Sequence, residues 1–356
     1  MEMPVKGYNN QPVTGSNESI LYSGNDNLRV YQVSKKAELV PINDADGSWK
    51  AASAETTPDF SATAYYFGQL VQEITKIPIG LIEASWGGSN IEAWMDKATL
   101  ENFPDISFPE IVPEVYPQQG ATLLYNGMLH SFRNLPVKGV IWYQGESNRL
   151  KADKYKELFP ALIHSWRTGR DQPDLPVYFV QIAPFNYSAF NDPPNASALL
   201  REAQLHVMKT VPNTGMVVTA DIGDCQNIHP PIKKEVGRRL AYWALANNYN
   251  MKGVEFSGPV YRSMEPEDGQ RIRIYFDYTS NGLTSLGYAL KGFEIAGADR
   301  KFVPAQATIH ADHSVSVWSN AVSEPVAVRY AFGNCAEGTL FNLAGLPASP
   351  FRTDKW

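Results

Sequence analysis

Short apolar runs alternate with amphipathic helical patterns over most of the first 250 residues of the chain. Apolar residues recur at helical spacing in stretches that begin near Asp59, Leu123, Asp153, Ser197 and Lys233. The predicted strands between these helices are Ile79 to Ala84, Val137 to Tyr143, Val177 to Ile182 and Met216 to Ala220. Such alternation indicates right-handed βαβ units and a parallel sheet that is covered by helices on both faces.

The two ends of the chain do not show this alternation of strands and helices. Residues 1–58 are polar and irregular, with one short strand pattern from Arg29 to Val33. After Asn250 the helical periodicity stops, and short β-rich runs separated by turn residues take its place. We therefore predict an α/β domain over residues 1–250 and an all-β module of sandwich type over residues 251–356.

Composition excludes several classes of protein. The chain has 356 residues, 31 Lys and Arg against 37 Asp and Glu, and no basic cluster, so nucleic acid is not expected as a partner. No apolar run approaches the roughly 18 residues of a membrane span. Cys225 and Cys335 leave two alternatives open, one disulfide or two free thiols.

The polar segments that directly follow the predicted strands carry the candidate chemistry, because ligands bind at the carboxyl ends of parallel strands. A Gly87-Gly88 turn follows the first of these strands, and its backbone N–H groups suit a substrate oxygen. Asn148 follows the second strand and offers an amide donor to the same oxygen. His229 follows the fourth strand as a candidate general base, with Asp221 and Asp224 upstream to orient it. A base, an orienting group and two oxyanion donors together indicate acyl transfer.

Each of these features also has a structural explanation. Gly87-Gly88, taken alone, is better explained as a strand-to-helix turn, Glu146 and Asn148 are typical loop caps, and the two aspartates are typical turn residues. The six histidines contain no HxH or HxxxH spacing, so no metal site is predicted. The position of all three segments at carboxyl ends of predicted parallel strands favours the catalytic interpretation.

Three segments resemble the second, third and fifth sequence blocks of the sialate O-acetylesterase family of SGNH hydrolases. They are Trp86-Gly87-Gly88-Ser89, Ile141-Trp142-Tyr143-Gln144-Gly145-Glu146-Ser147-Asn148 and Ile228-His229-Pro230. Further similar segments lie at Tyr125 to Met128, at Gly237 to Ala241 and at the end of the chain, Leu346 to Asp354. The resemblance covers essentially the whole chain, and it implies a flavodoxin-like, three-layer SGNH fold for the α/β domain.

The resemblance also implies roles for individual residues. Gly88, or Gly87 in its place, is implied as the backbone donor of the oxyanion hole, Asn148 as its side-chain donor and His229 as the general base. Gln144 and Glu146 match positions that shape the pocket. The family often places an aspartate three residues before the histidine, but Gln226 stands there, so Asp224, Asp221 or a backbone carbonyl is left as the orienting group.

The nucleophile has no match in this chain. In the family it is the serine of a Gly-Gln-Ser-Asn-Met-Glu segment at the end of the first core strand, and Met1-Glu2-Met3-Pro4 resembles the text that follows that serine. We therefore expect a chain that starts just past its nucleophile and lacks the first strand of its sheet, with a seam in the sheet as the consequence. Ser16, in Thr14-Gly15-Ser16-Asn17, is the rival, although no apolar strand precedes it. Ser89 and Ser147 lie inside the oxyanion blocks and are weaker rivals.

The resemblance implies a serine esterase that removes O-acetyl groups from sugars, O-acetylated sialic acid above all, without a metal or another cofactor. The predicted partner is a small acetylated carbohydrate, and the oligomeric state is left open. A periplasmic or extracellular location is implied if a signal peptide precedes the chain. The alternatives are a non-catalytic carbohydrate-binding protein and an acetyl xylan esterase-like activity.

Overall fold

The computed structural model describes all residues from 1 to 356. The chain divides into two compact units. Unit 1 consists of Met1–Val180, His206–Val217 and His229–Lys252. Unit 2 consists of Gln181–Leu205, Val218–Ile228 and Gly253–Trp356. Unit 2 thus includes two segments that lie before residue 250, and the domain boundary at 250 stays a prediction.

Unit 1 carries the predicted parallel strands, which confirms the α/β fold class. The strands form two separate three-stranded sheets, in the orders β2-β1-β3 and β4-β5-β6. Their bounds are β1 (Asn25–Val33), β2 (Gly47–Ala52), β3 (Ile79–Glu83), β4 (Val140–Trp142), β5 (Val177–Val180) and β6 (Thr214–Val217). β1 pairs with β3 in parallel, as β5 does with β4 and β6, whereas β2 runs antiparallel to β1. β3 and β4 are therefore both edge strands of their sheets.

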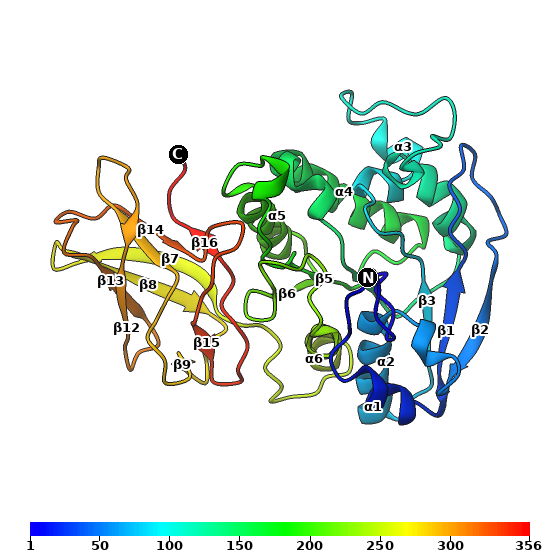
Figure 1. Cartoon of the computed structure of the whole chain (residues 1–356), viewed down its shortest axis with the longest axis horizontal. Coiled ribbons are helices and arrows are strands. Elements are labelled where there is room, and N and C mark those ends of the chain that lie inside the picture. Colours follow the sequence, from blue (N-terminus) through cyan, green and yellow to red (C-terminus); the bar gives the residue numbers. More distant parts are fainter. The chain divides into compact units, whose positions relative to one another are not determined.

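Four of the five predicted helices are observed, and two short helices were not predicted. The bounds are α1 (Ser16–Leu21), α2 (Ala62–Thr75), α3 (Lys97–Leu100), α4 (Ala152–Gly169), α5 (Ala196–Thr210) and α6 (Lys233–Asn247). Ser61 caps α2, since its hydroxyl accepts a hydrogen bond of 3.2 Å from the Ala64 N–H. In Figure 1, α2 lies beside β1 and β3, which form the blue sheet with β2. None of the helices is long and apolar enough to span a bilayer.

Two local predictions differ from the structure. The helix expected around Leu123 to Phe132 is a π-helical turn, Tyr125–Leu129, followed by a 3-10 turn, His130–Phe132. The Asn126 amide there donates to the carbonyls of Glu38 and Leu39 at 3.0 Å each, so this segment is tied to a loop. β2 was not expected, because most of its residues are exposed and show no buried alternation.

Aromatic side chains pack closely around the second parallel sheet. Trp142 of β4 contacts Trp166 of α4 with ring centroids 5.3 Å apart, and Phe159 of α4 contacts Phe179 of β5 at 4.8 Å. All four side chains are buried. This packing fixes the end of β4, from which the Gln144–Asn148 segment departs.

The C-terminal part of unit 2 is the predicted β module. It contains two four-stranded sheets, β11-β10-β14-β16 and β12-β13-β8-β7, and a two-stranded β15-β9 pair. The strand bounds are β7 (Val260–Glu267), β8 (Arg271–Asp277), β9 (Leu283–Thr284), β10 (Phe293–Ala296), β11 (Val303–Pro304), β12 (Gln306–Ile309), β13 (Val315–Trp318), β14 (Ala327–Tyr330), β15 (Phe341–Asn342) and β16 (Phe351–Arg352). One apolar core joins inward side chains of both sheets, among them Ile274 and Val317 from one and Ile295 and Val328 from the other. This is the packing of a β-sandwich.

Candidate active site

The Gly-Gly turn that follows β3 offers one unused backbone donor. The Gly87 N–H donates to the Glu2 carboxylate, and a Cβ at Gly87 would lie 2.6 Å from Glu2 Oε2. Gly88 has a φ of +75°, which glycine adopts at little cost, and its carbonyl accepts a hydrogen bond of 3.2 Å from Gln119 Nε2. The Gly88 N–H has no acceptor within the chain, so Gly88 rather than Gly87 fits an oxyanion donor.

Asn148 is held in one orientation by three hydrogen bonds. It lies on the 3-10 helix Glu146–Lys151 and is only 2% exposed. Its Oδ1 accepts from the Ile91 N–H at 2.9 Å and from Gln144 Nε2 at 2.7 Å. Its Nδ2 donates to the Glu92 carboxylate at 2.9 Å. Because an amide nitrogen has two hydrogens, this network fixes which atom is the nitrogen and leaves one N–H for a substrate oxygen.

Gln144 joins the two predicted oxyanion segments. Its Nε2 also donates to the Ser89 carbonyl at 2.9 Å, directly after the Gly-Gly turn. Its Oε1 accepts from the hydroxyl of Tyr155, on α4, at 3.1 Å. Gln144 thus links Asn148 to the segment that follows the Gly87–Gly88 turn, and the catalytic roles of these residues stay predictions.

His229 lies at the start of the segment that leads into α6. It is half-buried, and its ring makes an edge-to-face contact with Tyr8 at a centroid distance of 5.6 Å. Burial, followed by the positive charge of Lys233, lowers the pKa of His229 below its usual value. The carboxylates of Glu146 and Glu2 act in the opposite direction. The neutral imidazole, which is the form a general base requires, is therefore favoured at neutral pH.

Lys233 is a buried cation beside this histidine. It is the first residue of α6 and only 5% exposed, and its Nζ lies 5.3 Å from the centroid of the Tyr143 ring. Burial lowers the pKa of Lys233 to about 8, although Glu146 opposes this shift. A positive charge at a helix N-terminus is also unfavourable. The sequence pattern carried no sign that Lys233 is buried.

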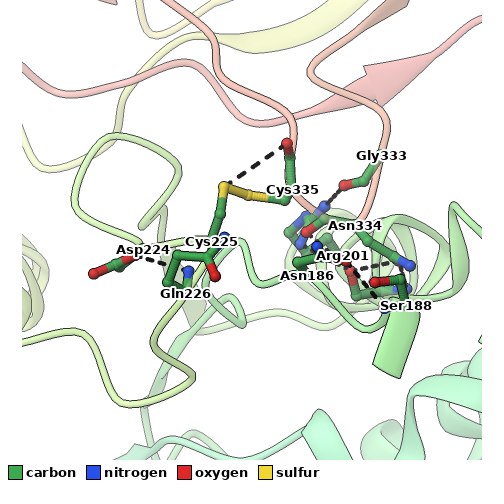
Figure 2. Close-up of a disulfide and its surroundings, with 10 residues drawn as sticks. Asn186, Ser188, Arg201, Asp224, Cys225, Gln226, Gly333, Asn334 and Cys335 are labelled. Carbon is green, nitrogen blue, oxygen red and sulfur yellow. Dashed lines mark hydrogen bonds between the residues drawn. A yellow bond between two sulfur atoms is a disulfide. The ribbon is translucent and has the colours of Figure 1, made fainter. Parts of the chain in front are cut away.

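Asp224 belongs to unit 2 and is exposed. Its Oδ1 accepts a hydrogen bond of 2.8 Å from the Gln226 N–H, which closes an Asx turn (Figure 2). This turn accounts for an aspartate at position 224, as the structural interpretation of the sequence allowed. The role of Asp224 in orienting His229 stays a prediction.

The serines considered as alternative nucleophiles lie in positions that have structural explanations. Ser16 begins α1 after a turn rather than at a strand end. Ser89 is 5% exposed, and its hydroxyl accepts a hydrogen bond of 2.9 Å from the Trp94 indole. The chain contains no group of three or more His, Cys, Asp or Glu side chains that could hold a metal ion.

Besides Lys233, three residues around the site were missed at the level of sequence. Glu92 accepts from Asn148, Glu2 accepts from Gly87, and Tyr8 contacts His229. Glu92 lies three residues after Ser89, and an acidic residue so close to an oxyanion segment is the one signal that could have drawn attention to it.

Comparisons with known proteins agree on one family. A family model described as carbohydrate esterase, sialic acid-specific acetylesterase, matches residues 22–246. The sialate O-acetylesterase of Mus musculus is 31% identical over 396 residues, which cover 91% of this chain and 70% of the mouse protein. The human sialate O-acetylesterase is 31% identical over 262 residues, which cover 67% of this chain and 50% of the human protein.

Among solved structures, a carbohydrate acetylesterase from Xanthomonas citri has the same fold. It is 38% identical, with a TM-score of 0.90, and the match covers 100% of this chain and 78% of the Xanthomonas chain.

Proposed function

Because the chain belongs to the carbohydrate esterase family of sialic acid-specific acetylesterases, we propose that it removes acetyl groups from sugar hydroxyls, with O-acetylated sialic acid as the foremost substrate. Membership confirms the family resemblance of the sequence and the general reaction, the hydrolysis of a carboxylic ester. The sugar is proposed from the names of the mouse and human relatives, which are sialate O-acetylesterases.

The proposed mechanism is a serine-type acyl transfer. The neutral His229 imidazole takes the proton of the serine hydroxyl while the serine oxygen attacks the acetyl carbonyl. The carbonyl electrons move to oxygen, and the Gly88 N–H and the remaining Asn148 N–H stabilise this oxyanion. His229 then gives its proton to the departing sugar oxygen, and water, activated by the same imidazole, releases acetate from the serine.

The observation that carries this proposal is the orientation of Asn148. Its carbonyl oxygen is occupied by Ile91 and Gln144, so the amide presents nitrogen rather than oxygen to the site. A buried amide whose acceptor side is fully used, and which retains one donor, is suited to a developing negative charge. A residue that only capped a loop would not need its amide nitrogen held on one side in this way.

The serine of the mechanism stays unassigned within residues 1–356, and its place directly before Met1 stays a prediction. We would measure acetate release from an activated aryl acetate by this chain and by a version extended with the codons that precede Met1 in its gene. Each version is compared with its His229→Ala variant. We expect turnover in the extended version, and a loss of about 10²- to 10⁴-fold on substitution of His229.

Two outcomes would overturn the proposal. One is an active protein that keeps its rate after His229→Ala. The other is a pair of folded proteins that are silent on aryl acetates and on O-acetylated sialic acid, which would favour a carbohydrate-binding protein. Turnover of acetylated xylosides with no turnover of acetylated sialic acid would retain the reaction and correct the sugar.

A further inference from the structure

A pocket of about 220 Å³ opens in unit 1 at the carboxyl ends of β1 and β3. Its lining includes Glu2, Tyr8, Gln32, Lys35, Glu83 and Ser85. Gln32 lies near the end of β1, Glu83 ends β3, and Ser85 follows β3. At the roughly 30 Å³ that a water molecule occupies in the liquid, the pocket has room for about seven waters, which is the scale of one sugar ring.

The pocket adjoins the groups assigned to catalysis. Glu2, in its lining, accepts the hydrogen bond of the Gly87 N–H, next to the proposed oxyanion donor. Tyr8, also in its lining, contacts the His229 ring at 5.6 Å. A Cβ at Gly87 would lie 3.7 Å from the Tyr8 hydroxyl, so Tyr8 stands between the Gly-Gly turn and the histidine. A ligand in this pocket would therefore lie beside the reacting bond.

The lining is rich in hydrogen-bond acceptors that retain capacity. The Gln32 amide donates to the Asp59 carbonyl at 2.8 Å, and its own carbonyl oxygen has no donor within the chain. The Ser85 hydroxyl donates to Glu83 Oε1 at 2.9 Å, which leaves the serine oxygen free to accept. The Tyr8 hydroxyl has no hydrogen bond within the chain. Sugar hydroxyls are donors of the kind that these oxygens require, and the Tyr8 ring offers an apolar surface to the C–H groups of a sugar.

The charged side chains of the pocket lining favour the uncharged part of a sugar over a sugar carboxylate. Of its four charged side chains, Glu2, Asp59 and Glu83 are acidic and Lys35 is basic. Lys35 already forms an ion pair with Glu2. A sugar carboxylate placed among these groups would face more like charge than opposite charge.

We propose that this pocket is the subsite for the sugar ring of the ester, and that it binds the uncharged, hydroxyl-bearing face of that ring. The proposal rests on the proposed esterase function and adds the place and the chemistry of sugar recognition. An acetylated sialic acid would then bind with its carboxylate outside the pocket.

The test is a binding measurement that needs no turnover. The chain is titrated with N-acetylneuraminic acid and with methyl β-xylopyranoside, and binding is followed by saturation-transfer NMR and calorimetry. Gln32→Ala and Ser85→Ala each remove an acceptor from a different strand end, and Gln270→Ala, in an exposed turn of unit 2, is the matched control. We expect both pocket variants to weaken both sugars by about threefold to tenfold, and the control to leave both unchanged.

The pocket assignment fails if neither sugar binds at tens of millimolar, or if both folded variants bind both sugars as the unaltered chain does. The assignment of the uncharged face fails if only N-acetylneuraminic acid is weakened, since that sugar alone carries the carboxylate. If neither sugar binds but the esterase activity still depends on His229, the subsite assignment alone is overturned. If the sugars bind as expected but the His229→Ala variant keeps the esterase activity, the proposed function alone is overturned.

Discussion

The proposed oxyanion segments and the loop that leads into His229 are fixed in different ways. Around Asn148 and Gln144, buried side chains hold one another through hydrogen bonds of 2.7 to 3.1 Å. The Val218–Ile228 segment, in contrast, exposes Asp221, Asp224 and Gln226 to solvent and is tied by a disulfide between Cys225 and Cys335. A buried polar network can orient its own members, whereas an exposed loop gains order from an external tie.

The disulfide lies beside a cluster of hydrogen-bonded polar residues in unit 2 (Figure 2). Asn334, next to Cys335, accepts from the Ser197 N–H at 2.9 Å and donates to the Pro193 carbonyl at 2.8 Å. On the other side of the bridge, the Cys225 carbonyl accepts from the Asn186 N–H at 3.0 Å. Both cysteines are therefore paired, which decides between the alternatives that the sequence left open. A disulfide of this kind is typical of proteins in oxidising compartments.

The largest expected effect on stability comes from removing the disulfide between Cys225 and Cys335. Cys335→Ala should lower the free energy of unfolding by about 2 to 5 kcal/mol, at the upper end of that range because the bridge joins residues 110 positions apart. Guanidinium unfolding followed by circular dichroism measures the change. The unaltered chain in excess reductant should show the same shift, and the variant should be insensitive to reductant. An unchanged midpoint in both would contradict a stabilising role for the bridge.

The second prediction breaks the hydrogen-bonded network. Asn148→Ala should lower kcat by about 10²- to 10³-fold in the active form of the enzyme, since it removes one oxyanion donor. It should leave KM for an aryl acetate nearly unchanged, because the donor acts on charge that develops in the transition state.

The control for that prediction is Asn148→Asp, which keeps the size of the side chain and loses the donor. This substitution would also place a second carboxylate within hydrogen-bond distance of Glu92, where the amide nitrogen now lies 2.9 Å away, so thermal stability should fall as well. If Asn148→Ala kept full kcat while remaining folded, the oxyanion role of this residue would be wrong.

The same comparison shows what the sequence could predict. The parallel strands and the bounds of α6 followed from periodicity, whereas β2 did not. The segments around Gly88, Asn148 and His229 were singled out by their places after predicted strands, and their roles stay predictions. The partners of those groups did not, because Glu2 reaches Gly87 across 85 positions and Glu92 reaches Asn148 across 56. Contacts at such separations depend on how strands and helices are arranged in space, which no local pattern encodes.

The third prediction concerns the backbone of the Gly-Gly turn. Gly88 has a φ of +75°, and a Cβ there would meet only Gln118 Nε2, at 3.5 Å. Gly88→Ala should therefore cost about 1 to 2 kcal/mol of stability through conformation rather than collision, and should lower kcat as the donor shifts.

Gly15 is a matched control in the same unit, with a φ of +71° and nothing within 4 Å of the position that a Cβ would take. Gly15→Ala should show a similar loss of stability by thermal unfolding with kcat unchanged. Equal losses of kcat in both variants would mean that general destabilisation, rather than the position of the Gly88 N–H, explains the effect.

The smallest expected effect is a shift in the titration of His229. Burial and the positive charge of Lys233 oppose protonation of the imidazole and lower its pKa, whereas Glu146 and Glu2 favour protonation. Lys233→Met removes one opposing charge and keeps an unbranched side chain that is one atom shorter, so the pKa of His229 should rise toward its usual value. NMR titration of the imidazole measures this directly, and the acid limb of kcat/KM should move to higher pH with it.

The sign of the accompanying stability change follows from linkage. A histidine whose pKa is lowered in the folded state contributes stability that is complete above its unfolded pKa of about 6.5 and is lost as the pH falls through the folded pKa. Lys233→Met should therefore make the free energy of unfolding less dependent on pH below about 6.5. Lys234→Met, one residue further along α6 at an exposed position, is the control and should leave the His229 titration in place. If both variants shifted the titration equally, the effect would belong to net charge rather than to the buried ammonium beside the imidazole.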